Sequence, residues 1–233
     1  MLQHERKSSL LRLPILAGLG DAVIERFAES CVWRQYDAGE QMVGYQDSST
    51  DVYFLLVGKA RAIVHSSEGK AVVYVDLKPG DMFGEIAAID RKPRSASIEA
   101  LEKCTIASLS ADHFERFMLS APSVAIATLR HVVANVRRLS DRVFEFSTLA
   151  VQNRIHAELL RLASETGQRH PEVVLSPAPS LSDIANRIST HREAVSRELS
   201  RLATIGVLRR DGSNLTITNF EKLAALVHEA REE

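Results

Sequence analysis

The hydrophobic pattern of the chain changes near Pro122, and this change limits the folds that it can adopt. Between residues 32 and 109, short apolar runs alternate with glycines and polar turns. The runs are Val52–Val57, Ala60–Val64, Val72–Leu77, Ser97–Ala100 and Thr105–Leu109. Short β-branched and aromatic runs at this spacing favour an antiparallel barrel or sandwich. Residues 14–30 predict one short helix before the strands, capped by Asp21.

After Pro122 the apolar residues follow a helical period that is suited to a partner helix. Their spacing alternates between three and four over about three heptads, through Leu129, Val132, Val136, Leu139, Val143, Phe146 and Ala150. Such a heptad seam is typical of a coiled coil, so we predict a homodimer. The alternative is a single helix that packs on its own domain.

The last part of the chain predicts a helix-turn-helix followed by a two-stranded wing. A helix capped by Ser182 runs to Ile188, and a second, capped by Thr190, runs to about Ile205, where Gly206 ends it. A hairpin turn at Asp211-Gly212 then joins two short strands. The chain is therefore expected to be α+β, with domains at 1–122 (β-roll), 123–150 (dimerisation helix) and 151–233 (winged helix-turn-helix).

Residues 181–210 are basic within a chain whose net charge is -1. They hold six arginines against three acidic residues, an excess typical of a DNA-binding face. Arg192, Glu193, Ser196 and Arg197 lie on the second helix, opposite the apolar set Val195, Leu199 and Leu202. Arginine recognises guanine in the major groove and a carboxylate accepts from cytosine, so this set predicts base reading. The alternative is a solvated, charged helix without a specific role.

The loop Gly84–Ala96 places a carboxylate, Glu85, nine residues before Arg94 and Ser95. The guanidinium and hydroxyl suit phosphate oxygens, and backbone amides after Gly84 suit an anion nest. Glu85 would repel phosphate and is better matched to a sugar hydroxyl, so the loop predicts a site for a singly charged cyclic nucleotide. The alternative is a surface salt bridge between Glu85 and Arg94. No GxxxxGK[ST] motif supports phosphoryl transfer.

Composition argues against several other classes of protein. The two cysteines, Cys31 and Cys104, are far apart and form no metal-binding or cluster motif. No apolar run approaches the ~18 residues of a membrane span, and the N-terminus lacks the core of a secretory signal. We therefore expect a cytoplasmic protein without a metal site. The sequence contains no nucleophile motif, so we do not expect an enzyme.

Two segments make these expectations more specific. FGEIAAIDRKPRSASIEA resembles the phosphate-binding cassette of cyclic-nucleotide-binding domains. THREAVSREL resembles the recognition helix of the cyclic-AMP receptor protein (catabolite activator) and fumarate-nitrate regulator family of bacterial transcription regulators. The order of parts is similar as well, from about Pro14 to Val227, and it implies a jelly-roll-like β-roll, a dimer helix and a winged helix-turn-helix.

The resemblance implies roles for individual residues. Glu85 would bind the ribose 2′-hydroxyl, and Arg94 and Ser95 the cyclic phosphate, with backbone groups near Gly84 and Ile86. Leu139 and Ser140 stand where the receptor protein has a Thr–Ser pair that touches adenine across the dimer. Leu139 departs from that pattern, which affects purine selectivity. Asn135 replaces an arginine near the ligand.

The resemblance also implies a DNA site and a set of partners. The residues expected to contact a palindromic TGTGA-like site are Thr190, Arg192, Glu193, Ser196 and Arg197. The expected function is a cAMP-responsive homodimeric regulator that binds double-stranded DNA, with RNA polymerase as a further partner. The alternatives are a regulator of the same superfamily that responds to cGMP, to haem or a gas, or to no effector, and a regulatory module without DNA function.

Overall fold

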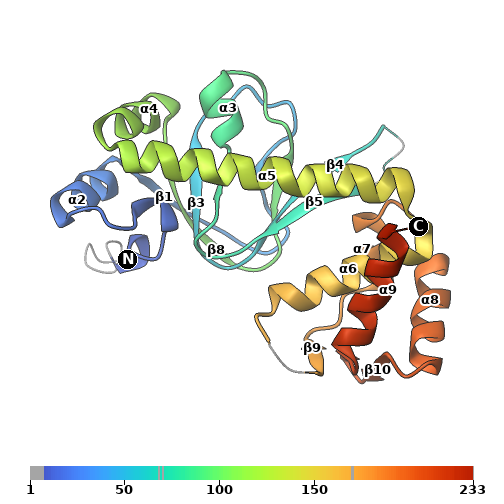
Figure 1. Ribbon diagram of the computed structural model, residues 1–233. Coiled ribbons are helices and arrows are strands. Elements are labelled where there is room, and N and C mark those ends of the chain that lie inside the picture. Colours follow the sequence, from blue (N-terminus) through green and yellow to red (C-terminus); the bar gives the residue numbers. More distant parts are fainter. Residues whose placement is uncertain (1–7, 68, 70, 169–170, 233) are drawn as a thin grey trace. The chain divides into compact units, whose positions relative to one another are not determined.

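The computed structural model describes residues 8–67, 69, 71–168 and 171–232 of the 233-residue chain (Figure 1). Residues 1–7, part of the N-terminus considered for a secretory signal, lie outside the described residues. Contacts between residues divide the chain into two units, 1–135 and 136–233. The division falls within the longest helix, so each unit is described separately below.

The first unit consists of short helices around eight strands. In chain order its elements are η1 (Pro14–Leu16), α2 (Asp21–Ser30), β1 (Val32–Tyr36), β2 (Gln41–Val43), β3 (Val52–Val57), β4 (Ala60–His65), β5 (Ala71–Leu77), β6 (Met82–Phe83), α3 (Glu85–Asp90), β7 (Ser97–Ala100), β8 (Cys104–Leu109), α4 (Ala111–Ser120) and the start of α5 (Pro122–Thr148).

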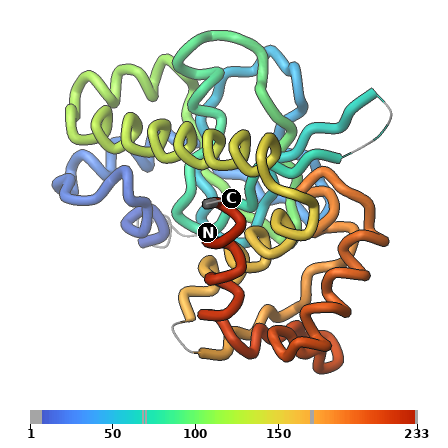
Figure 2. The backbone as a smooth tube through the Cα atoms, turned by 45° about the vertical axis from the view of Figure 1, so that its right-hand side comes forward, coloured from blue at the N-terminus to red at the C-terminus, as the bar shows by residue number. Residues whose placement is uncertain are grey.

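The strands form two four-stranded antiparallel sheets, in the orders β1-β8-β3-β6 and β2-β7-β4-β5. All five predicted apolar runs are strands, and β3 and β7 have the predicted bounds. The two-sheet β-roll expected from the sequence is thereby confirmed. The β4–β5 hairpin projects from the remaining strands (Figure 2).

Strand β3 is apolar along its whole length because both of its faces are buried. Phe54 packs with Phe27 of α2 and Phe114 of α4, whereas Leu55 packs with Ile106 between the sheets. Successive side chains of a strand point to opposite faces, so one strand contributes to both cores. The helices α2 and α4 lie side by side in Figure 1 and Figure 2.

The N-terminal helix differs from the single helix predicted for residues 14–30. The structure has a short 3-10 turn, η1, and then α2, whose N-cap is Gly20 rather than Asp21. Pro14 starts η1, where its missing N–H costs nothing, and the extended backbone of Ala17 ends it. Asp21 instead lies in the first turn of α2, where its charge complements the helix dipole.

The second unit is a helical domain with a small sheet. After the end of α5, it contains α6 (Val151–Glu165), β9 (Val173–Leu175), α7 (Leu181–Arg187), α8 (Arg192–Thr204), β10 (Leu208–Asp211), β11 (Asn214–Ile217) and α9 (Phe220–Glu232). The antiparallel sheet has the order β10-β11-β9. The predicted helix-turn-helix and wing are present, and β9 adds a third strand.

The caps of the two helices of this motif differ from those predicted. Ser180, not Ser182, caps α7: its hydroxyl oxygen accepts from the backbone N–H of Asp183 at 3.0 Å. The N-cap of α8 is His191, one residue after the predicted Thr190, and its side chain makes no capping bond. Gly206 follows α8 with a φ of 71°, which confirms the predicted helix end.

The heptad seam is exposed along α5. The exposed fractions are 58% for Leu129, 57% for Val136 and 65% for Val143. The helix ends at Thr148, so Ala150, the last predicted seam residue, lies beyond it as the N-cap of α6. Within the described ranges no single helix has the length and hydropathy of a membrane span; α4 and α5 pass that test only as a pair, and they are bent by 117°.

Two glycines of the β-roll provide a test of its packing. Gly39 and Gly58 have φ values of 85° and 89°, so alanine would strain the backbone of each similarly, by about 1–2 kcal/mol. A Cβ at Gly58 would also lie 2.4 Å from the carbonyl oxygen of Lys103, whereas one at Gly39 would meet nothing within 4 Å. We expect Gly58→Ala to lower the free energy of unfolding by about 2–5 kcal/mol, because strain and collision add. Gly39→Ala should lower it only by the backbone strain of about 1–2 kcal/mol. Urea unfolding followed by Trp33 fluorescence measures both, and equal losses would contradict this packing.

Candidate functional site

The candidate ligand site begins at a left-handed turn between β6 and α3. Gly84 has φ 83° and ψ 1°. A Cβ at this position would lie 2.6 Å from Nη1 of Arg94 and 2.7 Å from the carbonyl oxygen of Asp51. Glycine is therefore required here both for the backbone conformation and for the approach of the Arg94 side chain.

The guanidinium of Arg94 is buried, with 2% of the residue exposed. Its Nε donates to Ser49 Oγ at 3.1 Å, its Nη1 donates to the Gly84 carbonyl at 3.1 Å, and its Cζ lies 5.3 Å from the centre of the Tyr53 ring. The third nitrogen, Nη2, is buried and has no hydrogen-bond partner. Within the described residues, Arg94 forms no ion pair with a carboxylate. A buried cation with an unused donor is suited to an anionic ligand.

The backbone around Arg94 is fixed by the loop that precedes β3. The Arg94 N–H donates to the Asp47 carbonyl at 2.9 Å, and the Gln46 N–H donates to the Arg94 carbonyl at 3.0 Å. These two main-chain hydrogen bonds hold the backbone of Arg94 in place. Less conformational entropy is therefore lost when a ligand binds to its side chain.

Glu85 is buried as well, with 4% of the residue exposed, but it faces α5. Its Oε1 accepts from Asn135 Nδ2 at 3.4 Å and lies 3.4 Å from His131 Nε2. The alternative of a surface salt bridge between Glu85 and Arg94 is therefore wrong, because both groups are buried and each contacts different partners. The site keeps one negative and one positive group apart.

The remaining predicted ligand residues are more exposed. Ser95 is exposed beside Arg94, and Ile86 is 47% exposed in the first turn of α3. Leu139 and Ser140 belong to the second unit. Leu139 is 46% exposed, and the Ser140 hydroxyl donates to the Val136 carbonyl within α5.

Three contacts of the site were not identified from the sequence. Ser49 reaches Arg94 from the loop before β3 and Tyr53 from β3 itself, and His131 reaches Glu85 from α5. Tyr53 lies within an apolar run, where an aromatic residue is usual. Only the pairing of β3 with β6 brings it beside the loop.

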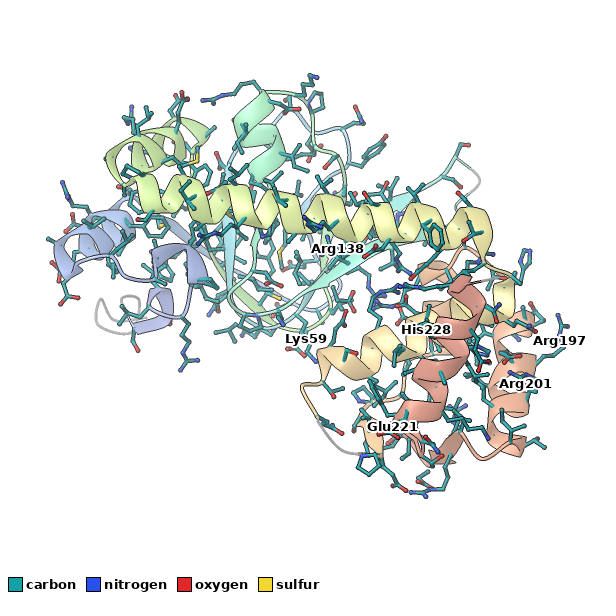
Figure 3. The ribbon with its side chains drawn as sticks, viewed as in Figure 1. Lys59, Arg138, Arg197, Arg201, Glu221 and His228 are labelled. Atoms are coloured by element: carbon teal, nitrogen blue, oxygen red, sulfur yellow. The ribbon has the colours of Figure 1, made fainter. Side chains whose placement is uncertain are left out.

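The candidate DNA-binding residues gather on one side of α8. Arg192, Glu193, Ser196 and Arg197 are exposed, and Arg197 extends outward from the helix in Figure 3. Arg192 Nε lies 3.2 Å from Glu193 Oε1. Thr190 is half-buried in the turn before the helix, and its N–H donates to the Ala185 carbonyl.

Two of the six arginines counted in the basic segment pair with buried carboxylates of the same unit, although Arg201 itself is exposed. Arg187 is 5% exposed and pairs with Glu158 at 3.4 Å and with Asp183 at 3.2 Å. Arg201 donates to Glu198 at 2.7 Å. The positive face is therefore smaller than the sequence count indicates, because buried carboxylates neutralise these two side chains.

A buried pair joins α8 to α6. His156 Nε2 lies 2.6 Å from Glu198 Oε1. Burial lowers the pKa of His156, and Glu198 offsets part of this effect. Burial raises the pKa of Glu198, but the hydrogen bonds from Arg201 and His156 outweigh it and hold that pKa below its ordinary value. The pair positions α8 against the core of its own unit.

A second buried cluster joins four helices of the same unit. Glu158 of α6 contacts Arg142 of α5 at 2.8 Å and also Arg161. Glu145 of α5 contacts Arg161 at 2.9 Å and Arg231 of α9 at 2.7 Å. Together with Arg187 of α7, these residues tie the end of α5 to the helix-turn-helix. In the described ranges, no group of three or more His, Cys, Asp or Glu side chains is placed to hold a metal ion.

Comparisons with known proteins agree with both units. The model of the cyclic nucleotide-binding domain matches residues 33–121, and that of the Crp-like helix-turn-helix domain matches residues 153–226. The CRP-like cAMP-activated global transcriptional regulator of Mycobacterium tuberculosis is 23% identical over 216 residues, which cover 92% of this chain and 96% of that protein. The cAMP-activated regulator CRP of Pasteurella multocida is 24% identical over 84% of this chain and 95% of its own length.

Solved structures show the same fold. A mutant of CooA from Carboxydothermus hydrogenoformans matches with a TM-score of 0.77 at 18% identity, over 92% of this chain and 94% of that one. The c-di-GMP responsive regulator CLP of Xanthomonas campestris matches with a TM-score of 0.74 at 19% identity, over 85% and 99%. From the two domain models and the curated relatives, the chain belongs to the CRP/FNR family and is a transcription regulator with a cyclic-nucleotide-binding domain.

Proposed function

We propose that the protein is a homodimeric regulator whose binding to double-stranded DNA responds to cAMP. The observation that carries the choice of a cyclic nucleotide is the buried guanidinium of Arg94, whose Nη2 has no protein partner. One free donor beside Ser95 suits the single charge of a cyclic phosphate. The names of the M. tuberculosis and P. multocida relatives support cAMP as the effector.

The second charged group gives the ligand its orientation. Glu85 would accept from the ribose 2′-hydroxyl through the carboxylate oxygen that His131 and Asn135 leave free. Backbone groups of Gly84 and Ile86 would complete the phosphate contacts. Leu139 and Ser140, on the dimerisation helix at 123–150, would face the purine across the dimer. Because Leu139 lacks the hydroxyl of the threonine that the receptor protein has at this position, the relative affinities for cAMP and cGMP are the first to measure.

The output would be read by α8. In the proposed complex, Thr190, Ser196 and the charged residues Arg192, Glu193 and Arg197 contact a palindromic TGTGA-like site. Two copies of the domain at 151–233 would enter successive major grooves about 34 Å apart. Coupling to the β-roll domain at 1–122 requires the DNA-competent state to bind nucleotide more tightly. Such a regulator would act in the cytoplasm, on RNA polymerase at its promoters, rather than as an enzyme.

Replacing Arg94 tests the ligand site. We expect Arg94→Ala to weaken cAMP binding about 10- to 100-fold, since charge-assisted hydrogen bonds contribute about 1.5–3 kcal/mol. The matched control is Arg91→Ala, because Arg91 lies in the same loop but pairs outward with Asp112 and Glu115. Calorimetric titration with cAMP and cGMP measures the affinities. Unchanged affinity in Arg94→Ala, with the fold retained, would refute the site.

Replacing Arg192 tests base recognition. We expect Arg192→Ala to lose about 1–3 kcal/mol of binding free energy and to relax the preference at one base position of the TGTGA-containing duplex. Competition gel retardation against duplexes with single base changes measures this, with Arg116→Ala on α4 as the control for overall charge. A uniform loss across all DNA sequences would show that Arg192 contacts phosphate instead.

Replacing Val143 tests the dimer. Val143 is exposed in the seam of α5, whereas Ala134 is exposed at a position off the seam. We expect Val143→Asp to weaken dimerisation by about 3 kcal/mol or more, because an unpaired carboxylate is then desolvated in the interface, and Ala134→Asp to leave it unchanged. Sedimentation equilibrium measures both variants. A monomeric wild-type protein would contradict the proposal.

A further inference from the structure

The buried carboxylate of Glu85 has an unusual pair of neighbours on α5. His131 and Asn135 are one helical turn apart, so their side chains share a face. His131 Nε2 and Asn135 Nδ2 each lie 3.4 Å from Glu85 Oε1, and the two nitrogens are 3.1 Å apart. The three groups therefore form one polar cluster in the first unit.

The charge of this cluster is set by His131. Within the described residues, the imidazole is the only cationic partner at ion-pair distance from Glu85, and Glu85 is the only charged group at that distance from the imidazole. Arg94 lies on the other side of the Gly84 carbonyl, to which it donates. No permanent positive charge thus pairs with this buried carboxylate, and histidine is the side chain that titrates near neutral pH.

We propose that His131 is a positioning residue of the nucleotide site, and that binding of a cyclic nucleotide is coupled to the protonation of this imidazole. The inference rests on the function proposed above. It adds a regulation of the same site, because ligand affinity then depends on pH through a residue that does not itself contact the phosphate.

The hydrogen bonds of the cluster allow two arrangements. When His131 is neutral, its Nε2 lone pair accepts from Asn135 Nδ2, and Glu85 keeps its full negative charge. When His131 is protonated, Nε2–H donates to Glu85 Oε1, and the Asn135 amide turns its oxygen toward the imidazolium. Only in the second arrangement is the carboxylate charge compensated, while Oε2 stays free for a ligand hydroxyl.

The sign of the coupling follows from the charges. An anionic ligand is repelled by an uncompensated Glu85 and attracted by an imidazolium. Protonated His131 therefore favours the bound state, and by linkage the bound state favours protonated His131. Affinity should therefore rise as the pH falls, and binding should be accompanied by an uptake of protons.

Calorimetric titration of the full-length protein with cAMP, between pH 5.5 and pH 8, tests the inference. We expect wild-type affinity to be about three- to tenfold higher at the acidic end. Titration at one pH within this range, in buffers of different ionisation enthalpy, should show a net uptake of protons on binding. A structural role of His131 alone would not produce this uptake.

Three variants separate the imidazole from other groups. His131→Gln should remove the pH dependence and the proton uptake and hold affinity at the alkaline value. His131→Arg should restore the tight affinity at every pH, because its charge is permanent. His65→Gln, on the exposed end of β4, should behave as wild type.

The outcomes distinguish this inference from the proposed function. Binding of cAMP with a pH dependence that survives in His131→Gln would overturn the role of His131 and leave the nucleotide site intact. Absence of binding of cAMP and cGMP at every pH would overturn both.

Discussion

The guanidinium of Arg94 is buried and pairs with no carboxylate among the described residues, and the geometry of the site follows from this constraint. A desolvated cation must be hydrogen-bonded, and here the Gly84 carbonyl, the Ser49 hydroxyl and the face of the Tyr53 ring surround it. Gly84 has no alternative, since any Cβ would collide with Arg94. The donor left over at Nη2 makes the loop an anion site rather than a structural ion pair.

The separation of Arg94 from Glu85 gives the site its polarity. A direct salt bridge would have neutralised both groups and left nothing for a ligand. Instead Glu85 faces α5, the helix that also carries the exposed seam. One continuous helix therefore carries the contacts to the candidate ligand site in one unit and begins the buried cluster around Glu158 in the other. In the proposed mechanism, this continuity connects nucleotide binding to DNA recognition.

Much of the architecture could be predicted because it depends on local patterns. In the run Val52–Val57, the first five apolar side chains are buried in a strand between two cores, and Gly206 ends α8 because it tolerates a positive φ. The exact caps could not be predicted, since Ser180 and Ser182 are equivalent in composition and only the start of α7 distinguishes them. The number of arginines in residues 181–210 overstated the positive charge of the exposed face for a similar reason. The burial of Arg187 depends on Glu158, which lies 29 residues away in the sequence.

The order of β-roll, long helix and winged helix-turn-helix follows from the amino-acid sequence alone, as do the residue types of both candidate sites. Hydrophobic period, glycine turns and charge clusters are local properties of the chain. The pairing of charged side chains, in contrast, depends on the folded structure. The folded structure separated Glu85 from Arg94, placed His131 beside Glu85 and brought Arg187 to Glu158. Ion pairs and buried donors form between side chains that are distant in sequence, so only the packing of helices and strands can assign them.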